Sequence, residues 1–265
     1  MPVTSDWPGI LVVLPTLGER LDSLEQAILS ATSQDDVDVR VVVVAPDNQS
    51  GAIELARIHG AEVVSDPGRG MSAAINAGLV ARSDERFYIW LGDDDSYRPG
   101  GLATLAKLLD SHPDAVVAYG ACEYVSEDGS VLWVSRGGDW ARRLIGVGPN
   151  LIPHPAAMMR LDALERVGGY DEDLRLVMDL EVLLKLKREG GFVSTSNVVS
   201  AFGWHPGSLT VADRRASAAE ARIVKRRFLP RWVRWAEPLW EYPVAWASQI
   251  AASRLNRRGN SERNH

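Results

Sequence analysis

The sequence lacks several features that would point to other classes of protein. It contains one cysteine, Cys122, which excludes an intrachain disulfide and a four-cysteine zinc site. No apolar run reaches the roughly eighteen residues that a membrane-spanning helix needs. The N-terminal segment has no basic stretch followed by an apolar one, so we expect no signal peptide. The sequence also lacks a Gly-x-x-x-x-Gly-Lys-Ser/Thr phosphate loop and a Gly-x-Ser-x-Gly turn.

What is present is ordinary globular composition with an uneven charge. Hydrophobic residues make up 46% of the 265 residues and charged residues 24%, which excludes a disordered chain. The net charge is 29 − 35 = −6, so we expect no nucleic-acid partner. From Arg222 onward, ten basic and three acidic residues give +7, which leaves −13 on residues 1–221.

The basic C-terminal segment also contains four of the nine tryptophans. Its apolar residues recur at helical spacing, although Pro238 and Pro243 interrupt the pattern and favour two short helices. Such a face predicts either packing on the rest of the protein or on a second subunit, or contact with an anionic membrane surface. The face consists of Trp232, Trp235, Leu239, Tyr242, Trp246 and Ile250.

Apolar, partly β-branched runs alternate with segments of helical spacing in the first half of the chain. This alternation predicts an α/β protein whose mostly parallel sheet is covered by helices on both faces. We predict buried strands at 10–14, 39–44, 62–65 and 87–91, and helices at 21–31, around 53–57, at 71–81 and at 99–109 with Pro99 in the first turn.

The second half of the chain is less regular. Asp128-Gly129 predicts a hairpin turn between strands at 115–124 and 131–135. Residues 140–155 are rich in Gly and Pro and are expected to form a loop. Further helices are predicted at 160–167, 177–189 and 212–228, and residues 254–265 are expected to form a disordered end.

Polar residues follow three of the predicted strands, at 15–19, 45–48 and 92–95. Parallel strands bring such loops to one edge of the sheet, where α/β proteins bind ligands. The last loop contains three adjacent carboxylates, Asp93, Asp94 and Asp95. They repel each other, and a hard divalent cation with oxygen ligands would relieve the repulsion. The alternative is a solvated acidic turn.

An ordered set of motifs resembles the family-2 glycosyltransferases, which have the GT-A fold. The resemblance covers about residues 10–210 and implies a GT-A domain at 1–210, with a nucleotide-sugar half at about 1–100 and an acceptor half at about 101–210. A helical extension would follow at 211–265. The motifs are Pro15-Thr16, Ser65–Gly78, Trp90–Gly100, Ile152–Pro155, Gly168–Glu172, Met178–Glu181 and Trp204-His205.

The resemblance implies inverting transfer of a sugar from a UDP-, GDP- or dTDP-linked donor to an acceptor hydroxyl, with Mn²⁺ or Mg²⁺. It implies that Asp94 holds the metal together with Asp95 and His205, and that Asp93 helps to hold metal or ribose. The residues expected at the donor are Pro15, Thr16, Glu19, Asp47, Arg69, Asp93 and Asp94.

The resemblance assigns the catalytic base to Asp179, which would take the proton of the acceptor hydroxyl. Read by position alone, Asp179 could instead cap the helix that follows, and Glu181 is a second candidate for the base. His154 is expected near donor or acceptor, with a structural role as the alternative. For His205 the alternative to metal ligation is a loop histidine bonded to the backbone.

Three departures from the family pattern concern the donor. Ala45 stands where many members have the Asp that reads the nucleotide base, and Asp47 is the nearest acid. Gly18 stands in place of a frequent Asn, and Gly92 in place of Asn or Asp.

The resemblance implies a role in cell-surface polysaccharide or glycolipid synthesis, on a saccharide or lipid-linked acceptor. It places the protein in the cytoplasm, peripherally on the inner face of the membrane if residues 211–265 bind lipid, and a homodimer is a further expectation. The alternatives are a nucleotide-sugar-binding or scaffolding protein without turnover, and a nucleotidyltransferase. The stretch Gly68–Ala73 imitates a dinucleotide fingerprint but follows the third predicted strand, which argues against a nicotinamide enzyme.

Overall fold

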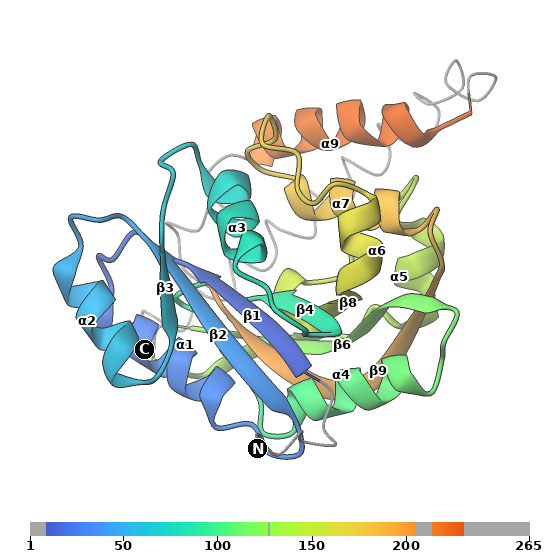
Figure 1. The fold of residues 1–265 in the computed structure, drawn as a ribbon. Coiled ribbons are helices and arrows are strands. Elements are labelled where there is room, and N and C mark those ends of the chain that lie inside the picture. Colours follow the sequence, from blue (N-terminus) through green and yellow to red (C-terminus); the bar gives the residue numbers. More distant parts are fainter. Residues whose placement is uncertain (1–8, 127, 205–213, 231–265) are drawn as a thin grey trace, which may run out of the picture.

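The computed structural model describes residues 9–126, 128–204 and 214–230 (Figure 1). The described strands form one sheet in the order β3-β2-β1-β4-β8-β6-β9-β5, and β7 pairs with β6 beside this path. The strands are β1 (Gly9–Pro15), β2 (Asp38–Ala45), β3 (Glu62–Ser65), β4 (Phe87–Trp90), β5 (Ser96–Tyr97), β6 (Ala115–Val125), β7 (Val131–Ser135), β8 (Ala157–Arg160) and β9 (Gly191–Gly203).

The helices lie on both faces of this sheet (Figure 1). They are α1 (Leu21–Thr32), α2 (Ser50–Ile58), α3 (Met71–Val80), α4 (Gly101–Asp110), α5 (Gly138–Leu144), the 3₁₀ helix η1 (His154–Ala156), α6 (Leu161–Arg166), α7 (Met178–Leu186) and α9 (Arg214–Phe228).

The first four strands form the parallel half of the sheet, as predicted. β1 lies between β2 and β4 and pairs with both in parallel, so Val12 faces Val41 on one side and Ile89 on the other. The other half is mixed, because β8 runs antiparallel to β4 and β6 whereas β9 runs parallel to β6. The carboxyl ends of β1, β2 and β4 therefore share one edge.

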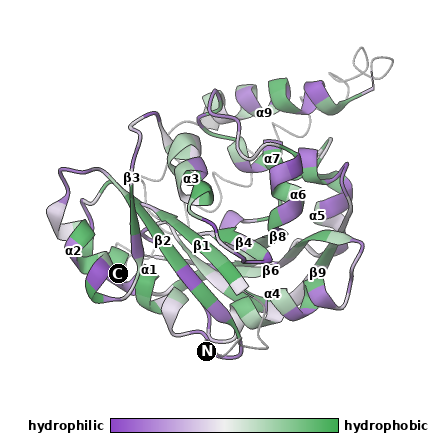
Figure 2. Cartoon of the chain, viewed as in Figure 1, coloured by the Kyte–Doolittle hydropathy of each residue, from purple (hydrophilic) through white to green (hydrophobic). Residues whose placement is uncertain are grey.

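Alternation along the central strands separates two hydrophobic cores. Leu11 and Val13 point to the face covered by α3, α5, α6 and α7, and Ile10 and Val12 point to the face covered by α1, α2 and α4. Because both faces of the central strand β1 are buried, residues 10–14 are all apolar, and the hydropathy colouring shows β1 mostly green and β2 green with a hydrophilic interruption (Figure 2).

The predicted hairpin is confirmed, since β6 pairs antiparallel with β7. The long strand β9 was not predicted from the sequence. Its middle, Ser194–Asn197, is a polar run without alternation, yet the strand pairs along β6 and with the short β5. Tertiary pairing overrides the local signal here. The expected loop at 140–155 is likewise partly helical, because α5 extends to Leu144.

The expected position of Pro99 in the first turn of a helix is wrong. α4 begins at Gly101, and the N–H of Gly101 donates to the carbonyl of Arg98 at 2.8 Å. Pro99 and Gly100 form the corner of this turn, and Gly100 has φ 70° and ψ 6°. A proline followed by a residue with positive φ is the arrangement of a type II turn, which explains the Pro-Gly pair.

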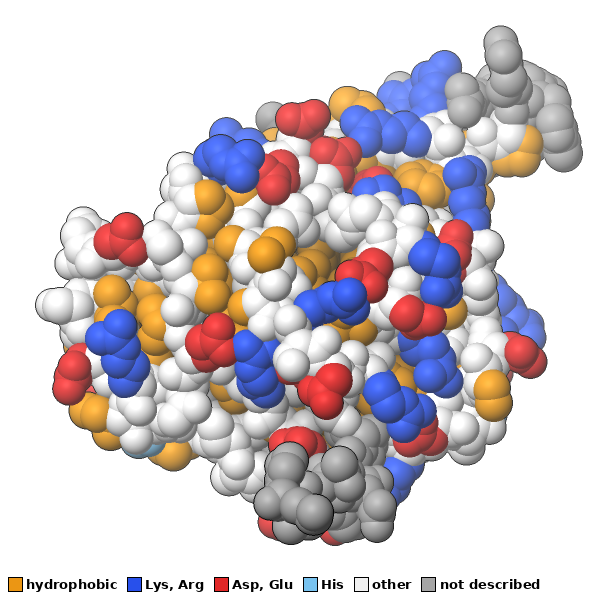
Figure 3. Space-filling model, in the orientation of Figure 1, with side chains coloured by type: hydrophobic (Ala, Val, Ile, Leu, Met, Phe, Trp, Pro, Cys, Tyr) orange, Lys and Arg blue, Asp and Glu red, His pale blue; other side chains and the backbone are white. Residues whose placement is uncertain are grey.

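No helix in the described ranges is long and apolar enough to span a membrane. On the face shown in Figure 3, acidic and basic side chains intermingle, and blue basic side chains gather near α9 at the upper right. The tryptophan-containing face at 232–250 and the disordered end expected at 254–265 lie outside the described residues.

Candidate active site

The acidic triplet directly follows β4 at the carboxyl edge of the parallel half. The N–H of Leu91 still donates to the carbonyl of Val13 at 3.0 Å, so the chain leaves the sheet at Gly92. The three carboxylates then enter different surroundings. The side chain of Asp94 is 23% exposed, that of Asp93 is 9% exposed, and that of Asp95 is 1% exposed.

Asp93 and Asp94 share a partner in Arg20, which the sequence analysis did not identify. Arg20 Nη2 lies 2.5 Å from Asp93 Oδ1, and Nη1 lies 3.0 Å from Asp94 Oδ2. The hydroxyl of Thr16 donates to Asp93 Oδ2 at 2.6 Å. Burial raises the pKa of Asp93, and the hydrogen bond from Thr16 and the charge of Arg20 offset this only in part.

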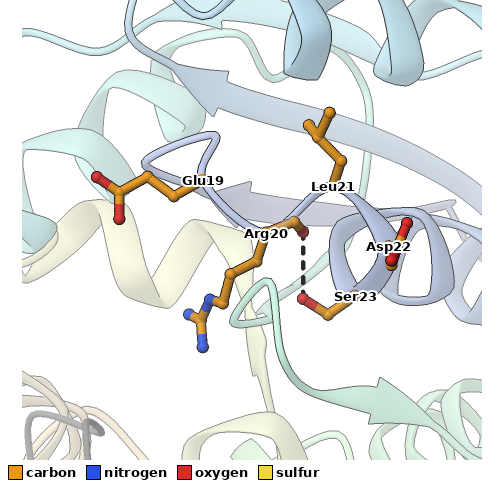
Figure 4. A pocket seen from close by; sticks show the side chains of 5 residues that line it. All are labelled: Glu19, Arg20, Leu21, Asp22 and Ser23. Atoms are coloured by element: carbon orange, nitrogen blue, oxygen red, sulfur yellow. Dashed lines mark hydrogen bonds between the residues drawn. The ribbon is translucent and has the colours of Figure 1, made fainter.

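Arg20 lies in the loop between β1 and α1, beside a cavity of about 520 Å³ lined by residues 19–23. In Figure 4, the side chains of Glu19 and Arg20 leave this loop in different directions, and the Ser23 hydroxyl donates to the Arg20 carbonyl. Open space therefore adjoins Arg20, whose guanidinium links this side to Asp93 and Asp94. A ligand with phosphate groups could reach the guanidinium from here.

Asp95 turns into the protein and has different partners. Its Oδ2 lies 2.9 Å from His154 Nε2, and its Oδ1 accepts the backbone N–H of Gly203 at 2.9 Å. A Cβ on Gly203 would lie 2.4 Å from the carbonyl oxygen of Asp94, so only glycine allows β9 to approach the triplet this closely. Both carboxylate oxygens of Asp95 are thus engaged within the protein.

A chain of contacts leads from Asp95 to Asp179. The ring of His154 stacks on Trp90, with 3.9 Å between centroids and 10° between the ring planes. The indole Nε1 of Trp90 donates to Asp179 Oδ1 at 3.2 Å. Trp90 ends β4 and Asp179 lies in the first turn of α7, so the fold brings two distant parts of the chain to one site.

The charges in this chain influence each other. Loss of water raises the pKa of the partly buried Asp179; the positive charge of His154 and the indole hydrogen bond lower it, but only in part. For His154, burial lowers the pKa, but the hydrogen bond and charge of Asp95, with the charges of Asp179 and Asp94, raise it above 6.5.

The two roles weighed for Asp179 can now be separated by geometry. The N-cap residue of α7 is Val177, whose own side chain makes no capping hydrogen bond. Asp179 uses its carboxylate toward Trp90 instead of the helix backbone. Glu181 is buried and pairs with Lys185 at 3.0 Å, and burial raises its pKa. Glu181 therefore pairs with a residue of its own helix and takes no part in the contact chain around Asp179.

The remaining donor residues predicted from the sequence lie on the same edge but make few contacts with the triplet. Pro15 ends β1 and is buried, and Asp47 is exposed in the turn after β2. Arg69 lies just before α3 and pairs with Glu172 at 2.6 Å. Its side chain faces the segment before α7 rather than Asp93 or Asp94. His205 lies outside the described residues.

The described residues contain no group of three or more His, Cys, Asp or Glu side chains arranged to hold a metal ion. The donor chemistry nevertheless fits a hard cation, because Asp93 and Asp94 are adjacent carboxylates that both converge on the guanidinium of Arg20. Mg²⁺ typically takes one or two carboxylates and completes its shell with substrate phosphates and water. These two residues would hold such a cation, in competition with Arg20.

Sequence reasoning missed Arg20 and Trp90 as site residues. Only its position could have identified Arg20 as a site residue: it follows the end of β1 by five residues and therefore lies at the edge of the sheet that also carries the triplet. Trp90 was read as a buried strand residue, which it is, but its indole N–H also reaches Asp179. A single sequence carries no signal for that second role.

Comparison with known proteins agrees with this geometry. Among solved structures, the mannosyltransferase PcManGT from Pyrobaculum calidifontis in complex with GDP-Man and Mn²⁺ aligns with a TM-score of 0.59 and 18% identity, over 98% of this chain and 82% of that one. S. aureus TarS 1-349 in complex with UDP-GlcNAc aligns with a TM-score of 0.61 and 16% identity, over 82% and 65%. Identities this low establish the fold alone.

A longer TarS structure aligns with a TM-score of 0.58 and 18% identity over 85% of this chain, which spans only 43% of that protein. No curated protein matches the sequence. The alignments confirm the expected fold class, a mostly parallel GT-A sheet flanked by helices. The description "Glycosyl transferase family 2" matches residues 11–168, more than half of the chain. The chain therefore belongs to glycosyl transferase family 2.

Proposed function

We propose that the protein transfers a sugar from a nucleotide-sugar to an acceptor hydroxyl with inversion at the anomeric carbon. The observation that carries this proposal is the pairing of two kinds of carboxylate at one edge of the sheet. Asp93 and Asp94 meet at Arg20, and Asp179 lies at the other end of the contact chain through Asp95, His154 and Trp90. The pair Asp93 and Asp94 suits the binding of a metal and the donor diphosphate, and Asp179 suits the uptake of a proton from the acceptor.

The donor half of the reaction uses the loops after β1, β2 and β4. Pro15, Thr16 and Glu19 would line the nucleotide, and Asp47 would contact its base in place of the acid that Ala45 lacks. Arg69 would approach the phosphates after leaving Glu172. The structures of TarS with UDP-GlcNAc and of PcManGT with GDP-Man support a UDP- or GDP-linked donor, and a dTDP-linked donor is the third candidate.

Asp93 and Asp94 would hold Mn²⁺ or Mg²⁺. When bound, such a cation neutralises charge on the leaving nucleoside diphosphate. The PcManGT complex contains Mn²⁺, which supports this choice for a shared fold. His205 and Asp95 stay predicted ligands. Of the triplet, Asp94 and Asp93 are the better placed, because Asp95 already engages His154 and Gly203.

Asp179 would act as the catalytic base. Its carboxylate accepts the proton of the acceptor hydroxyl while the hydroxyl oxygen attacks the anomeric carbon, and the bond to the nucleoside diphosphate breaks. One displacement inverts the anomeric centre and needs no nucleophile from the enzyme. The indole of Trp90 holds Asp179 Oδ1, which leaves Oδ2 for the acceptor. His154, between Asp95 and Trp90, would keep this arrangement fixed, and Glu181 would serve helix packing.

The acceptor would be a saccharide or a lipid-linked saccharide in cell-surface polysaccharide or glycolipid synthesis. Residues 211–265, with their basic and tryptophan-rich composition, would attach the protein peripherally to the inner face of the membrane or pack in a homodimer.

The proposal is tested first by donor binding. Melting temperatures are measured with UDP-, GDP- and dTDP-sugars, with and without Mn²⁺. A donor at about 100 times its Kd stabilises the folded state by about 2.7 kcal/mol. This corresponds to a rise of roughly 5–10 °C in Tm for a domain of this size. Absence of a shift for every donor with Mn²⁺ contradicts the proposal.

The second test separates turnover from binding. Asp179→Asn keeps the shape of the side chain and its hydrogen bond from Trp90 but removes the base. An enzyme loses transfer and keeps the Mn²⁺-dependent donor shift. A nucleotide-sugar-binding or scaffolding protein shows the donor shift but no transfer in either the wild type or the variant.

A further inference from the structure

The helix α9, which belongs to the C-terminal extension, reaches the chain directly before the proposed catalytic base. Glu220 on α9 accepts three backbone hydrogen bonds: from Arg175 at 3.1 Å, from Leu176 at 2.7 Å and from Val177 at 2.9 Å. Its Oε1 takes the first bond and its Oε2 takes the other two. A single carboxylate from another part of the chain therefore binds three consecutive N–H groups.

These three N–H groups belong to the segment directly before α7, which begins at Met178, and the last of them is on Val177, the N-cap residue of the helix. The N–H groups at the start of a helix have no partner within the helix, and a capping side chain or an anion normally satisfies them. α7 has no capping side chain of its own at Val177. Glu220 supplies a negative charge at the positive end of the α7 dipole from outside the helix.

Other contacts hold the same segment and α9 in place. The Ser72 hydroxyl of α3 donates to the carbonyl of Leu174 at 3.1 Å. Arg227 of α9 pairs with Asp171 at 3.0 Å, and Val224 of α9 is fully buried in the core with α7. Figure 1 shows α9 lying along the outer side of α7. The segment before α7 is thus held between α3 and α9.

We propose that Glu220 is a positioning residue for the catalytic base. Asp179 follows Val177 by two residues and lies in the first turn of α7, so the path of residues 175–177 sets the direction of its carboxylate. With Glu220 in place, that carboxylate meets the Trp90 indole and faces the acceptor side. The inference rests on the proposed role of Asp179. It makes α9 a functional part of the transferase site.

The test compares Glu220→Ala with Glu220→Gln, and uses Glu54→Ala on the exposed face of α2 as the control for loss of an acidic residue. Because a displacement of about 1 Å at a catalytic group can cost about 100-fold in rate, we expect kcat of Glu220→Ala to fall roughly 10- to 100-fold. The KM for the donor should stay within about two-fold, since Asp93, Asp94 and Arg20 are untouched.

Hydrogen exchange reports the mechanism directly. In Glu220→Ala the amides of residues 175–177 should exchange faster, while the amides of β1 and β4 keep wild-type rates. Glu220→Gln offers an amide oxygen that can replace Oε2 and keep the bonds from Leu176 and Val177. We therefore expect an intermediate kcat and slower exchange at 176 and 177 than in Glu220→Ala. Glu54→Ala should match the wild type in every measurement.

Two results overturn the inference. One is faster exchange at 175–177 with unchanged kcat, which would mean that the bonds exist but do not position the base. The other is a loss of donor binding in Glu220→Ala equal to the loss of kcat, which would mean general disruption. A wild-type protein that binds donor but transfers no sugar refutes the proposed function itself, and with it the role of Asp179 on which this inference depends.

Discussion

Replacement of Arg20 by Gln tests whether this side chain competes with a metal ion for the acidic pair. Arg20 contacts one oxygen of Asp93 and one of Asp94, the two carboxylates best placed for a divalent cation. A cation that binds both residues must first break these two ion pairs. In Arg20→Gln the two carboxylates lose the positive charge of this side chain, so the folded protein is less stable and binds the cation more tightly.

The size of the effect follows from exposure. The Arg20 side chain is 46% exposed, so solvent weakens both pairs, and the pair with Asp94 contributes roughly 0.2–1 kcal/mol. The pair with the more buried Asp93 contributes more, about 1 kcal/mol. The sum of about 1–2 kcal/mol predicts a Tm lower by roughly 2–8 °C without metal. It also predicts Mn²⁺ affinity about 5- to 30-fold higher in the variant.

The assay is titration of Mn²⁺ without donor, followed by electron paramagnetic resonance of the free ion, together with Tm before and after Mn²⁺. The control is Arg142→Gln, which removes an exposed ion pair with Asp139 far from the triplet. Arg142→Gln should bind Mn²⁺ like the wild type. Equal or weaker Mn²⁺ binding by Arg20→Gln would refute the reasoning, because Arg20 would then support the cation site instead of blocking it.

Three further outcomes are expected. The apparent pKa of the acid limb in the kcat/KM–pH profile should lie above the usual aspartate value, because the base is active only when ionised and burial raises the pKa of Asp179. An apparent pKa of 3.8 or below would contradict this expectation. Asp179→Asn should abolish transfer and raise Tm at pH 8. The reason is that a buried carboxyl with a raised pKa lowers the stability of the folded protein when it is ionised, and Asn removes this cost. An unchanged or lower Tm would contradict this prediction. His154→Ala should lower the free energy of unfolding by about 2–3 kcal/mol, because buried Asp95 loses a partner, and scanning calorimetry measures the change.

The helices on each face and the parallel half of the sheet could be predicted because their signals are local. Strands such as Ile10–Leu14 are apolar throughout and end in polar loops, and α/β topology then places those loops on one edge. β9 escaped prediction because its polar middle has no strand pattern of its own. Its place is fixed by pairing with β6, a long-range contact.

The candidate site divides in the same way. The triplet and Asp179 were found from residue type and motif, but their partners were not. Arg20 meets Asp93 across 73 residues of sequence, and Trp90 meets Asp179 across 89. Nothing in the spacing of a single chain encodes such a pairing, because it depends on how strands and helices pack.

The sequence by itself determined the α/β class and the edge of the sheet that carries the acidic triplet, and it supplied the chemistry proposed for these carboxylates. These follow from hydrophobic periodicity and from side-chain type, which are properties of short segments. The tertiary structure alone decided how the three aspartates differ: Asp95 turns inward to His154, while Asp93 and Asp94 meet Arg20. It also brought Glu220 to the start of α7. The burial and the partners of each carboxylate do not follow from residue identity, because both arise only when distant segments pack together.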